Sequence, residues 1–338
     1  MNKQKIMLAH GNGGLLMQRL INRLFISNFG NKILNRLDDS AVLSLNNKGK
    51  KIAFTTDSFV VNPIFFGGGD IGKLAVCGTV NDLSMMGARP LFLSAGVIIE
   101  EGFEIKQLEE IVGSMRRTLK EAGVEIVCGD TKVVNKGACD KIFINTAGIG
   151  IIDEGVDIHS ARARAKDSII VSGPVAEHGI AILSQREGLT FKTKLKSDCA
   201  PLNSLVADML KFSKSIHVLR DPTRGGLATA LNEIAAHSNV GIEISEKDVP
   251  VRASVKGACE ILGLDPLYLA CEGRLVAFVA QDKAKSVLGA MRNNKYAKNA
   301  TIIGQAVSRH KKEVYLDTLT GSNRILDVPV ADQMPRIC

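Results

Sequence analysis

A cysteine and a set of carboxylates are the residues of this 338-residue chain best suited to chemistry. The sequence ends Pro335-Arg336-Ile337-Cys338, and a thiol placed there has no following chain to enclose it in a core. We interpret Cys338 as a nucleophile on a movable arm, because an extended chain from Pro329 covers roughly 30 Å at about 3.3 Å per residue. The alternative is a frayed end in which the cysteine is accidental.

Acidic residues recur at predicted turns and helix starts. Carboxylates placed in this way suit Mg²⁺, which prefers oxygen ligands and often bridges to the phosphates of a substrate. Taken singly, each is more often a helix cap or an Asx-turn, so the prediction of a magnesium-nucleotide site rests on their combination. The acidic turns are Asp38-Asp39-Ser40, Thr55-Thr56-Asp57-Ser58, Asn81-Asp82, Gly129-Asp130-Thr131-Lys132 and Arg220-Asp221-Pro222-Thr223-Arg224-Gly225-Gly226.

Basic and glycine residues accompany these turns. Lys132 and Arg224 would neutralise phosphate charge, while Gly13-Gly14 and Gly225-Gly226 precede predicted helices and would expose backbone N–H groups to an anion. The chain contains neither a Walker A pattern nor a Rossmann glycine fingerprint. A nucleotide must therefore be held by another arrangement.

Hydrophobic periodicity predicts two α/β units that a polar segment, 152–167, separates. In the first unit we expect helices over 15–29, 70–87 and 104–122 and strands over 51–61, 91–99, 124–128 and 141–151. In the second we expect strands over 168–172, 215–219, 240–244, 273–280 and 300–308 and helices over 176–187, 201–212, 227–238, 253–263 and 283–292. The expected divisions are a glycine loop and helix (1–35), a first domain (36–151), a second domain (160–310) and an arm (311–338). Within 309–338 we expect one or two strands before the terminal part of the arm.

Composition excludes several classes of protein. Seven cysteines, an odd number without a CxxC pair, favour a reducing compartment, and no apolar run is long enough for a signal peptide or a membrane span, so we expect a cytoplasmic protein. The net charge of +8 is scattered, and the chain has no Trp and three Tyr, which disfavours nucleic-acid binding. Cys77, Cys128 and Cys271 are expected to be small buried hydrophobic residues.

Several motifs carry a resemblance to a known family. DDSAV (38–42), TTDSF (55–59), NDLSMMGARP (81–90), GDTKVV (129–134) and DPTRGG (221–226) resemble the PurM-like ATP-binding superfamily, which includes aminoimidazole ribotide synthetase. LAHGNGG (8–14), the glycine-rich stretch 65–88, EGRLV (272–276) and the final PRIC are similar to the HypE family of hydrogenase maturation factors. The resemblance covers nearly the whole chain, and PRIC is its most discriminating part.

The resemblance implies a fold and an activity. The fold would be the two-domain PurM-like α/β fold, with mixed sheets and flanking helices, and the first domains of two subunits would pair their sheets in a homodimer. The activity would be ATP- and Mg²⁺-dependent dehydration of an S-carbamoyl group on Cys338 to a thiocyanate, which supplies cyanide for the [NiFe]-hydrogenase cofactor. The implied partners are the carbamoyltransferase HypF and the iron-carrying HypC–HypD complex. An edge strand at 51–61, rich in apolar residues, would be compatible with dimerisation.

The resemblance also implies roles for individual residues. Glu272 would be the general base, although Glu-Gly is often only a turn, and His10 would contact phosphate or the arm unless it is structural. Segment 186–215 carries no motif. The implied catalytic residues are Cys338, Glu272 and Lys132; the nucleotide-binding residues are Gly13, Gly14, Asp57, Thr131, Thr223, Arg224, Gly225 and Gly226; and the metal ligands are Asp39, Asp57, Asp82, Asp130 and Asp221.

Other functions remain open from the sequence. A related synthetase or kinase acting on a small molecule would use the same acidic turns but would not need Cys338. A non-enzymatic carrier would need the thiol but would not turn over ATP. A nucleic-acid binder is the most distant alternative.

Overall fold

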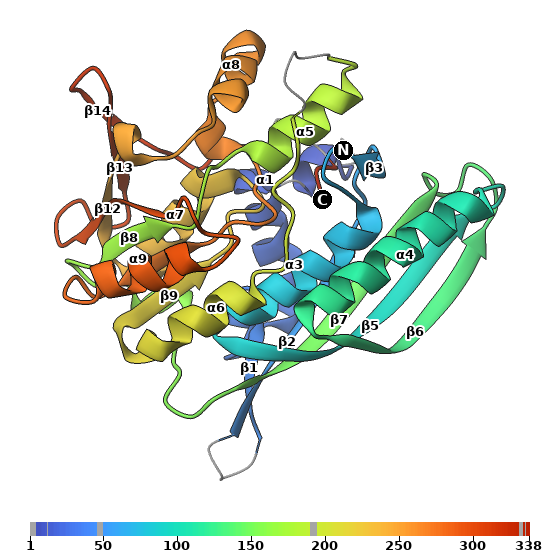
Figure 1. The fold of residues 1–338 in the computed structure, drawn as a ribbon, viewed down its shortest axis with the longest axis horizontal. Helices are drawn as coiled ribbons and strands as arrows, with labels where there is room; N and C mark the ends of the chain where they lie inside the picture. The colour runs from blue at the N-terminus through green and yellow to red at the C-terminus, as the bar shows by residue number, and fades with distance from the viewer. Residues whose placement is uncertain (1–4, 12, 46–49, 190–194, 331–333, 335) are drawn as a thin grey trace.

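The computed structural model describes residues 5–11, 13–45, 50–189, 195–330, 334 and 336–338. They form two α/β domains, each with its own sheet, which meet along a shared core (Figure 1). The helix predicted over 15–29 is present but contains a π-helical stretch. Short helical elements precede the first sheet: η1 Leu8–His10, α1 Gly14–Leu20, the π-helix η2 Ile21–Ile26, α2 Ser27–Phe29 and η3 Leu34–Arg36.

The first domain is built on a five-stranded sheet in the order β1-β2-β7-β5-β6. Neighbouring strands are antiparallel, except that β5 and β6 are parallel. The expectation that 51–61 forms an edge strand is wrong, because β2 pairs with β1 on one side and β7 on the other. The strands are β1 Ala41–Leu45, β2 Lys50–Phe59, β5 Ala88–Glu100, β6 Glu125–Val134 and β7 Ile142–Ile152, and β3 Phe65–Phe66 with β4 Gly69–Asp70 forms a separate hairpin.

Two helices, α3 Ile71–Met85 and α4 Ile105–Ala122, cover one face of this sheet (Figure 1). Asp70 begins α3, because its Oδ1 accepts hydrogen bonds from the N–H groups of Gly72 (2.8 Å) and Lys73 (3.0 Å). Ser114 of α4 donates to the same oxygen at 2.6 Å. The capping carboxylate therefore fixes both helices against each other.

The other face of the first sheet is apolar and exposed. Phe54, Phe92, Ile98 and Ile149 are each about 40% exposed, and the strand register pairs Ile149 with both Phe54 and Phe92. An apolar patch shared by neighbouring strands is typical of a surface that another protein covers.

Two strands of this domain differ from the prediction. β6 continues to Val134, beyond the predicted end at 128, because it stays in parallel register with β5 as far as the pair Glu100 and Val134. The GDTK motif consequently lies within a strand and not in a turn. β1 lies outside the predicted elements and is defined by its pairing with β2 from Ala41 to Leu45.

The second domain contains a seven-stranded sheet in the order β14-β13-β10-β12-β8-β11-β9. The pair β10 and β13 is parallel, and the other pairs are antiparallel. The strands are β8 Ser168–Val171, β9 Ile216–Arg220, β10 Gly241–Ser245, β11 Val276–Val279, β12 Thr301–Val307, β13 Val314–Asp317 and β14 Asn323–Ile325. The helical elements are η5 Ser160–Arg162, α5 Glu177–Arg186, α6 Asn203–Met209, η6 Leu210–Ser215, α7 Gly226–Ser238, η7 Glu246–Asp248, α8 Ala253–Leu262, η8 Pro266–Tyr268 and α9 Ala284–Asn293.

Both faces of the second sheet are buried. Ile170 and Ala277 pack into the core that α6 and α9 share with the first domain, whereas Ile169 and Phe278 pack on the opposite side with α7. This explains why β8 and β11 are continuous apolar runs without alternation. The predicted strands and helices of this domain all have counterparts, and the sheet extends past the boundary expected at 310, through β13 and β14.

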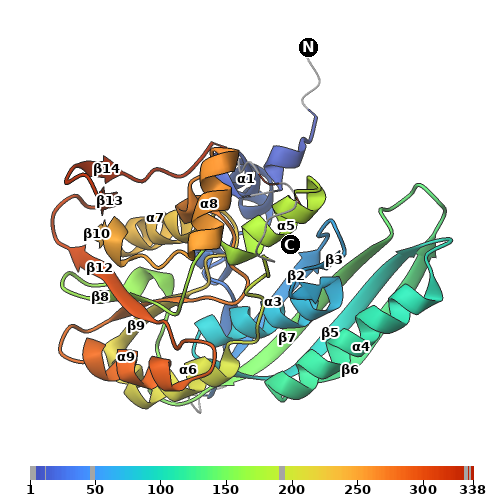
Figure 2. The ribbon, with the colours of Figure 1, turned by 45° about the horizontal axis from the view of Figure 1, so that its top comes forward.

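The end of the chain lies at the junction of the domains. Figures 1 and 2 both place it beside α5 and the β3–β4 hairpin. The N–H of Val60 donates to the carbonyl of Cys338 (3.0 Å), and the N–H of Asn62 donates to that of Arg336 (3.2 Å). Within the described ranges, no helix is long and apolar enough to cross a membrane.

Candidate active site

A cavity of about 590 Å³ lies between the two domains. Its wall combines residues from α1, β1, β2 and α3 of the first half of the chain with the β9–α7 loop, the loop around Glu272 and Cys338. Ten of the residues predicted to form the site line it: Gly13, Gly14, Asp39, Asp57, Asp82, Asp221, Thr223, Arg224, Glu272 and Cys338.

Four aspartates of different origin face this cavity. Asp39 precedes β1, Asp57 lies on β2, Asp82 on α3, and Asp221 directly follows β9. Burial raises the pKa of Asp39 and Asp82 well above the ordinary value, and the mutual repulsion of the carboxylates raises it further. Burial also raises the pKa of Asp57, and that of Asp221 to about 6. The cluster therefore resists ionisation unless a cation joins it.

Several buried oxygen atoms of the cavity are unpaired among the described residues. They are Ser40 Oγ, Asp221 Oδ2, Thr229 Oγ1 and Glu272 Oε1. Buried polar atoms without a partner are unusual in folded proteins and point to a ligand. The donor set, carboxylate and hydroxyl oxygens, fits Mg²⁺.

The carboxylates do not form a closed metal cage. Within the described parts of the chain, no three His, Cys, Asp or Glu side chains converge closely enough to hold an ion by themselves. Mg²⁺ commonly uses one or two protein carboxylates and completes its shell with water and substrate phosphates. The arrangement therefore fits an ion that arrives with a nucleotide.

Two arginines balance part of the negative charge. Arg220 forms ion pairs with Asp39 (2.8 Å) and Glu233 (2.6 Å), and Arg224 donates to Asp57 Oδ1 at 3.3 Å. Each pair with an aspartate joins the second domain to the first. Arg220 belongs to the strand just before DPTRGG, but sequence reasoning did not assign it a role; the available signal was an arginine at the end of an apolar run, directly before an aspartate.

The glycines behave differently at the two predicted loops. Gly13 adopts φ +92°, and a Cβ atom there would lie 3.2 Å from Cβ of Arg224, so the two loops pack closely. Gly225 and Gly226 begin α7 but do not line the cavity; Gly226 lies against the backbone of 267–269. The contribution of that loop to the cavity comes from Thr223 and Arg224.

The GDTK motif lies outside the cavity of its own chain. Asp130, Thr131 and Lys132 are exposed on β6, and Lys132 forms a salt bridge of 2.6 Å with Asp130. This interaction lowers the pKa of Asp130, in contrast to the other aspartates. Contrary to the expectation, these three residues therefore do not join the acidic cluster of their own chain, because β6 is an edge strand.

Glu272 is buried at the base of the cavity, with 3% of its surface exposed. Its N–H donates to Asp198 Oδ1 (3.0 Å), and its carbonyl accepts from Asn81 Nδ2 (3.3 Å). Burial raises the pKa of Glu272 well above the ordinary value, and Cys199, Asp221 and Asp57 raise it further. Both backbone contacts hold the residue in place and leave its carboxyl group available to a ligand.

Cys338 is half-buried at the edge of the same cavity. Burial raises the pKa of its thiol to about 12, while the neighbouring Arg224 guanidinium acts in the opposite direction. Nε2 of His178 lies 2.8 Å from the carbonyl of Ile337, and Arg186 donates to that of Arg336 at 2.8 Å. Contacts to the backbone of residues 336 and 337 thus hold the Cys338 thiol among Arg224, Asp57 and Glu272.

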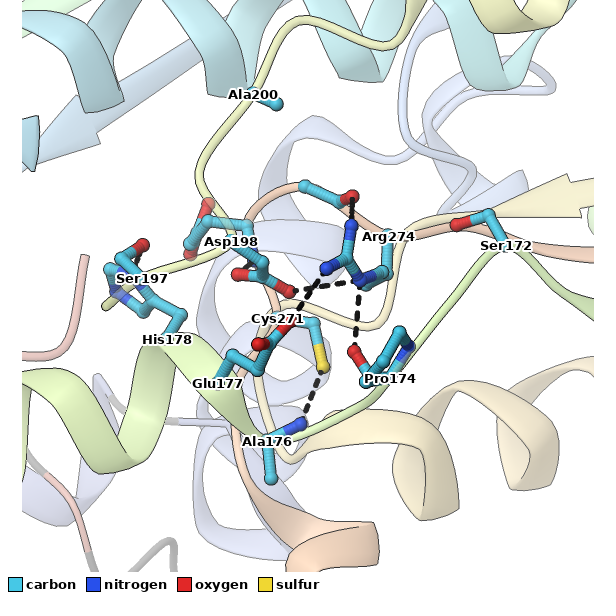
Figure 3. Close-up of polar contacts among 12 residues, drawn as sticks. Ser172, Pro174, Ala176, Glu177, His178, Ser197, Asp198, Ala200, Cys271 and Arg274 are labelled. Atoms are coloured by element: carbon cyan, nitrogen blue, oxygen red, sulfur yellow. Dashed lines mark hydrogen bonds and ion pairs between the residues drawn. The ribbon is translucent and has the colours of Figure 1, made fainter. Parts of the chain in front are cut away.

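A buried charged network supports the Glu272 loop (Figure 3). Arg274 donates to Glu177 Oε2 (2.6 Å) and to the carbonyl of Pro174 (2.8 Å), and it lies 3.7 Å from Asp198. Burial raises the pKa of Asp198 to about 6, which Arg274 partly offsets. Sequence reasoning missed Asp198, because segment 186–215 contains no motif.

The remaining candidates divide into buried and exposed residues. Cys77 and Cys271 are fully buried, as expected, but Cys128 is exposed, because it lies on the edge strand β6. His10 accepts a hydrogen bond from the N–H of Met7 (3.0 Å) and does not line the cavity. Its contact is local to η1.

Comparison with known proteins agrees with this geometry. The family models for the N-terminal and C-terminal domains of AIR synthase related protein match residues 37–152 and 164–317. The carbamoyl dehydratase HypE of Rhodobacter capsulatus is 49% identical over 338 residues, which are 99% of this chain and 98% of that protein. A crystal structure of the hydrogenase maturation protein HypE in complex with ATP is 48% identical, with a TM-score of 0.83, and covers 99% of this chain and 100% of that one. HypE in a crystal structure of the HypE–HypF complex is 50% identical, with a TM-score of 0.88, and the match covers 92% of this chain and 99% of that one.

Proposed function

This chain belongs to the HypE family of ATP-dependent carbamoyl dehydratases, which act in hydrogenase maturation, and from this we propose that it converts an S-carbamoyl group on Cys338 into a thiocyanate. The observation that carries the proposal is that the Cys338 thiol lines the same cavity as the four aspartates. A kinase for a free small molecule would not need a cysteine at that position.

The first step would be transfer of the γ-phosphoryl group to the carbamoyl oxygen. A bond forms between that oxygen and phosphorus, and the bond from phosphorus to the ADP oxygen breaks. Arg224 lies beside the thiol and would stabilise negative charge on the reacting groups. Asp39, Asp57, Asp82 and Asp221 would hold Mg²⁺, which supplies charge neutralisation to the phosphates when it is bound.

The second step would be elimination. The carbon–oxygen bond breaks, the oxygen leaves as inorganic phosphate, and both protons of the amide nitrogen are removed as the carbon–nitrogen bond becomes triple. Glu272 is the proposed base, because its carboxyl group is buried in the cavity and has an unpaired oxygen. A raised pKa makes a carboxylate a stronger base, and positive charge brought by Mg²⁺ would favour its ionised form.

The exposed apolar face of the first sheet supports the proposed homodimer. Asp130 and Lys132 register with Gly96 and Ile98, so the salt bridge lies on the face that carries Phe92 and Ile98. If a second copy covers this face, GDTK lies at the interface and not in the cavity of its own chain. We also propose HypF as the carbamoyl donor, because a HypE of this family has been crystallised with HypF, and HypC–HypD as the acceptor of the cyanide.

Intact mass spectrometry tests the reaction directly. The protein is incubated with the carbamoyltransferase and its carbamoyl source, and then with ATP and Mg²⁺. We expect one carbamoyl group on Cys338, followed by loss of one water when ATP is added. Retention of the carbamoyl group with ATP consumed elsewhere would favour a small-molecule kinase, and retention without ATP turnover would favour a carrier. The Cys338→Ser protein is the matched control and should gain no carbamoyl group.

A further inference from the structure

Three consecutive carbonyl groups near the cavity each accept a hydrogen bond. The backbone oxygens of Cys338 and Arg336 accept hydrogen bonds from the N–H groups of Val60 (3.0 Å) and Asn62 (3.2 Å). The carbonyl of Ile337, between them, is bound from a different element, α5. There it meets Nε2 of His178 at 2.8 Å. An imidazole thus binds the one backbone oxygen of 336–338 that residues 60–62 do not bind.

The hydrogen bonds fix the tautomer of His178. A carbonyl oxygen can only accept, so Nε2 carries the proton and Nδ1 is an acceptor. The hydroxyl of Ser197 donates to Nδ1 at 2.8 Å and in turn accepts from the N–H of Cys199 (3.0 Å). His178 is fully buried, and the edge of the Phe66 ring packs against it at 5.5 Å. Burial lowers the pKa of His178 to about 4, so the ring stays neutral at neutral pH.

The segment 197–199 also holds the proposed base. Asp198 lies between Ser197, which donates to His178, and Cys199, whose N–H donates to Ser197. Oδ1 of Asp198 accepts a hydrogen bond from the N–H of Glu272 at 3.0 Å. Figure 3 shows His178, Ser197 and Asp198 side by side, with Glu177 and Arg274 completing the network. A single short segment therefore contacts both the side chain that binds the tail and the peptide group of Glu272.

We propose that His178 is a positioning residue: oriented by Ser197, it holds the carbonyl of Ile337 and so places the sulfur of Cys338 in register with Glu272. The effect on catalysis rests on the proposed function. The docking of residues 336–338 does not, because it can be measured on the thiol without any turnover.

A matched pair of variants tests the docking. In His178→Gln, the amide nitrogen can reach the position of Nε2 and donate to Ile337, whereas the shorter His178→Asn places its polar atoms near Nδ1 only. We measure alkylation of Cys338 by N-ethylmaleimide in the nucleotide-free protein by peptide mass spectrometry. The alkylation rate of Cys338 in the wild-type protein under the same conditions is the reference.

We expect His178→Asn to alkylate Cys338 at least about 10-fold faster than wild type, because a lost hydrogen bond to a buried group shifts the docking equilibrium by about that factor. His178→Gln should stay within about 3-fold of wild type. Ser197→Ala, which removes the partner of Nδ1 and leaves the imidazole, should fall between them. Alkylation of Cys338 at the wild-type rate in His178→Asn would overturn the inference, as would equal acceleration in the Asn and Gln proteins.

Single-turnover thiocyanate formation separates this inference from the proposed function. With carbamoylated protein, His178→Asn should lower the rate of water loss about 10-fold while the KM for ATP stays unchanged, and His178→Gln should restore most of it. If wild type forms no thiocyanate but the alkylation pattern holds, the proposed function fails and the docking role of His178 stands. If thiocyanate forms normally and all variants alkylate alike, only the role of His178 is overturned.

Discussion

At the scale of single residues, the cavity concentrates carboxyl groups that are costly to ionise. Asp39, Asp82 and Glu272 all have a pKa raised well above the ordinary value, with burial as the main cause. For the four aspartates of the cavity, the charges of Arg220 and Arg224 and the hydrogen bonds that Ser58 and Thr55 donate lower the pKa and partly offset the effect of burial. The consequence is a site whose stability depends on pH and on the cation that it receives.

Asp221→Asn should remove part of that dependence. The pKa of Asp221 is about 6 in the folded protein, above its unfolded value of ~3.9, so the folded state binds more protons between these limits and wild-type stability falls as pH rises through them. The variant has no carboxyl group at this position and does not lose stability in this way. Its free energy of unfolding, relative to that of wild type, should therefore rise by up to about 3 kcal/mol between pH 4 and pH 7. Urea unfolding of nucleotide-free protein measures the difference; a gap that is constant with pH would contradict the assignment.

Glu272→Gln should separate loading from dehydration. Glutamine keeps the size of the side chain and the backbone contacts to Asp198 and Asn81, but it cannot accept a proton. We expect normal carbamoyl loading on Cys338 and a loss of about 100-fold or more in thiocyanate formation, which is the usual scale for a removed general base. Mass spectrometry follows both steps. Wild-type dehydration by this variant would exclude Glu272 as the base.

At the scale of secondary structure elements, the hydrophobic pattern of the sequence predicted most of the helices and strands. α4 was predictable because it is amphipathic, and β8 and β11 because they are continuous apolar runs. The pattern could not reveal that β6 continues to Val134, since that length is set by its register with β5. It also could not show that Asp198 supports Glu272, because the two residues are 74 positions apart and meet only in the fold.

The same limit applies to the candidate site. DDSAV, TTDSF and DPTRGG each delivered an aspartate to one cavity, because each motif ends or begins an element that faces the domain junction. GDTK did not, although its residue types are equally suitable, because its strand is at the far edge of the sheet. Residue types therefore predicted the chemistry, while topology decided which residues share a site within one chain.

The exposed face of the first sheet yields a prediction about assembly. Ile98→Glu places a charge on the apolar face, and we expect at least a 10-fold weaker dimer, since burying an unpaired carboxylate in an interface costs at least about 1.4 kcal/mol. Val112→Glu, on the exposed side of α4, is the matched control and should leave association unchanged. Sedimentation equilibrium measures both. Identical association of the two variants would exclude this face as the interface.

At the scale of the whole molecule, the cavity exists only because two domains meet. The first supplies Asp39, Asp57 and Asp82, and the second supplies Asp221, Arg224 and Glu272. Ion pairs from Arg220 and Arg224 cross the junction, as do the hydrogen bonds of Asn81 to Ala200 and Glu272. A ligand that binds in this cavity therefore contacts both domains and stabilises their association.

Nucleotide with magnesium should accordingly raise the melting temperature. A ligand at 100 times its Kd stabilises the folded state by about 2.7 kcal/mol, which corresponds to several degrees for a protein of this size. ATP with Mg²⁺ should produce this shift, and ATP with excess EDTA should produce little of it, because the carboxylates repel bare phosphates. Differential scanning fluorimetry makes the comparison. An equal shift with and without the metal would contradict the role given to the four aspartates.

Most of the residues that hold the end of the chain bind its backbone, whereas Arg224 interacts with the sulfur of Cys338 itself. Val60, Asn62, Arg186 and His178 all contact carbonyls of 336–338, and these carbonyls are the same whether the sulfur is free, carbamoylated or cyanated. These backbone contacts therefore hold residues 336–338 in the same way whatever group the sulfur carries. Arg224, which interacts with the sulfur, is the residue placed to distinguish a free thiol from a modified one.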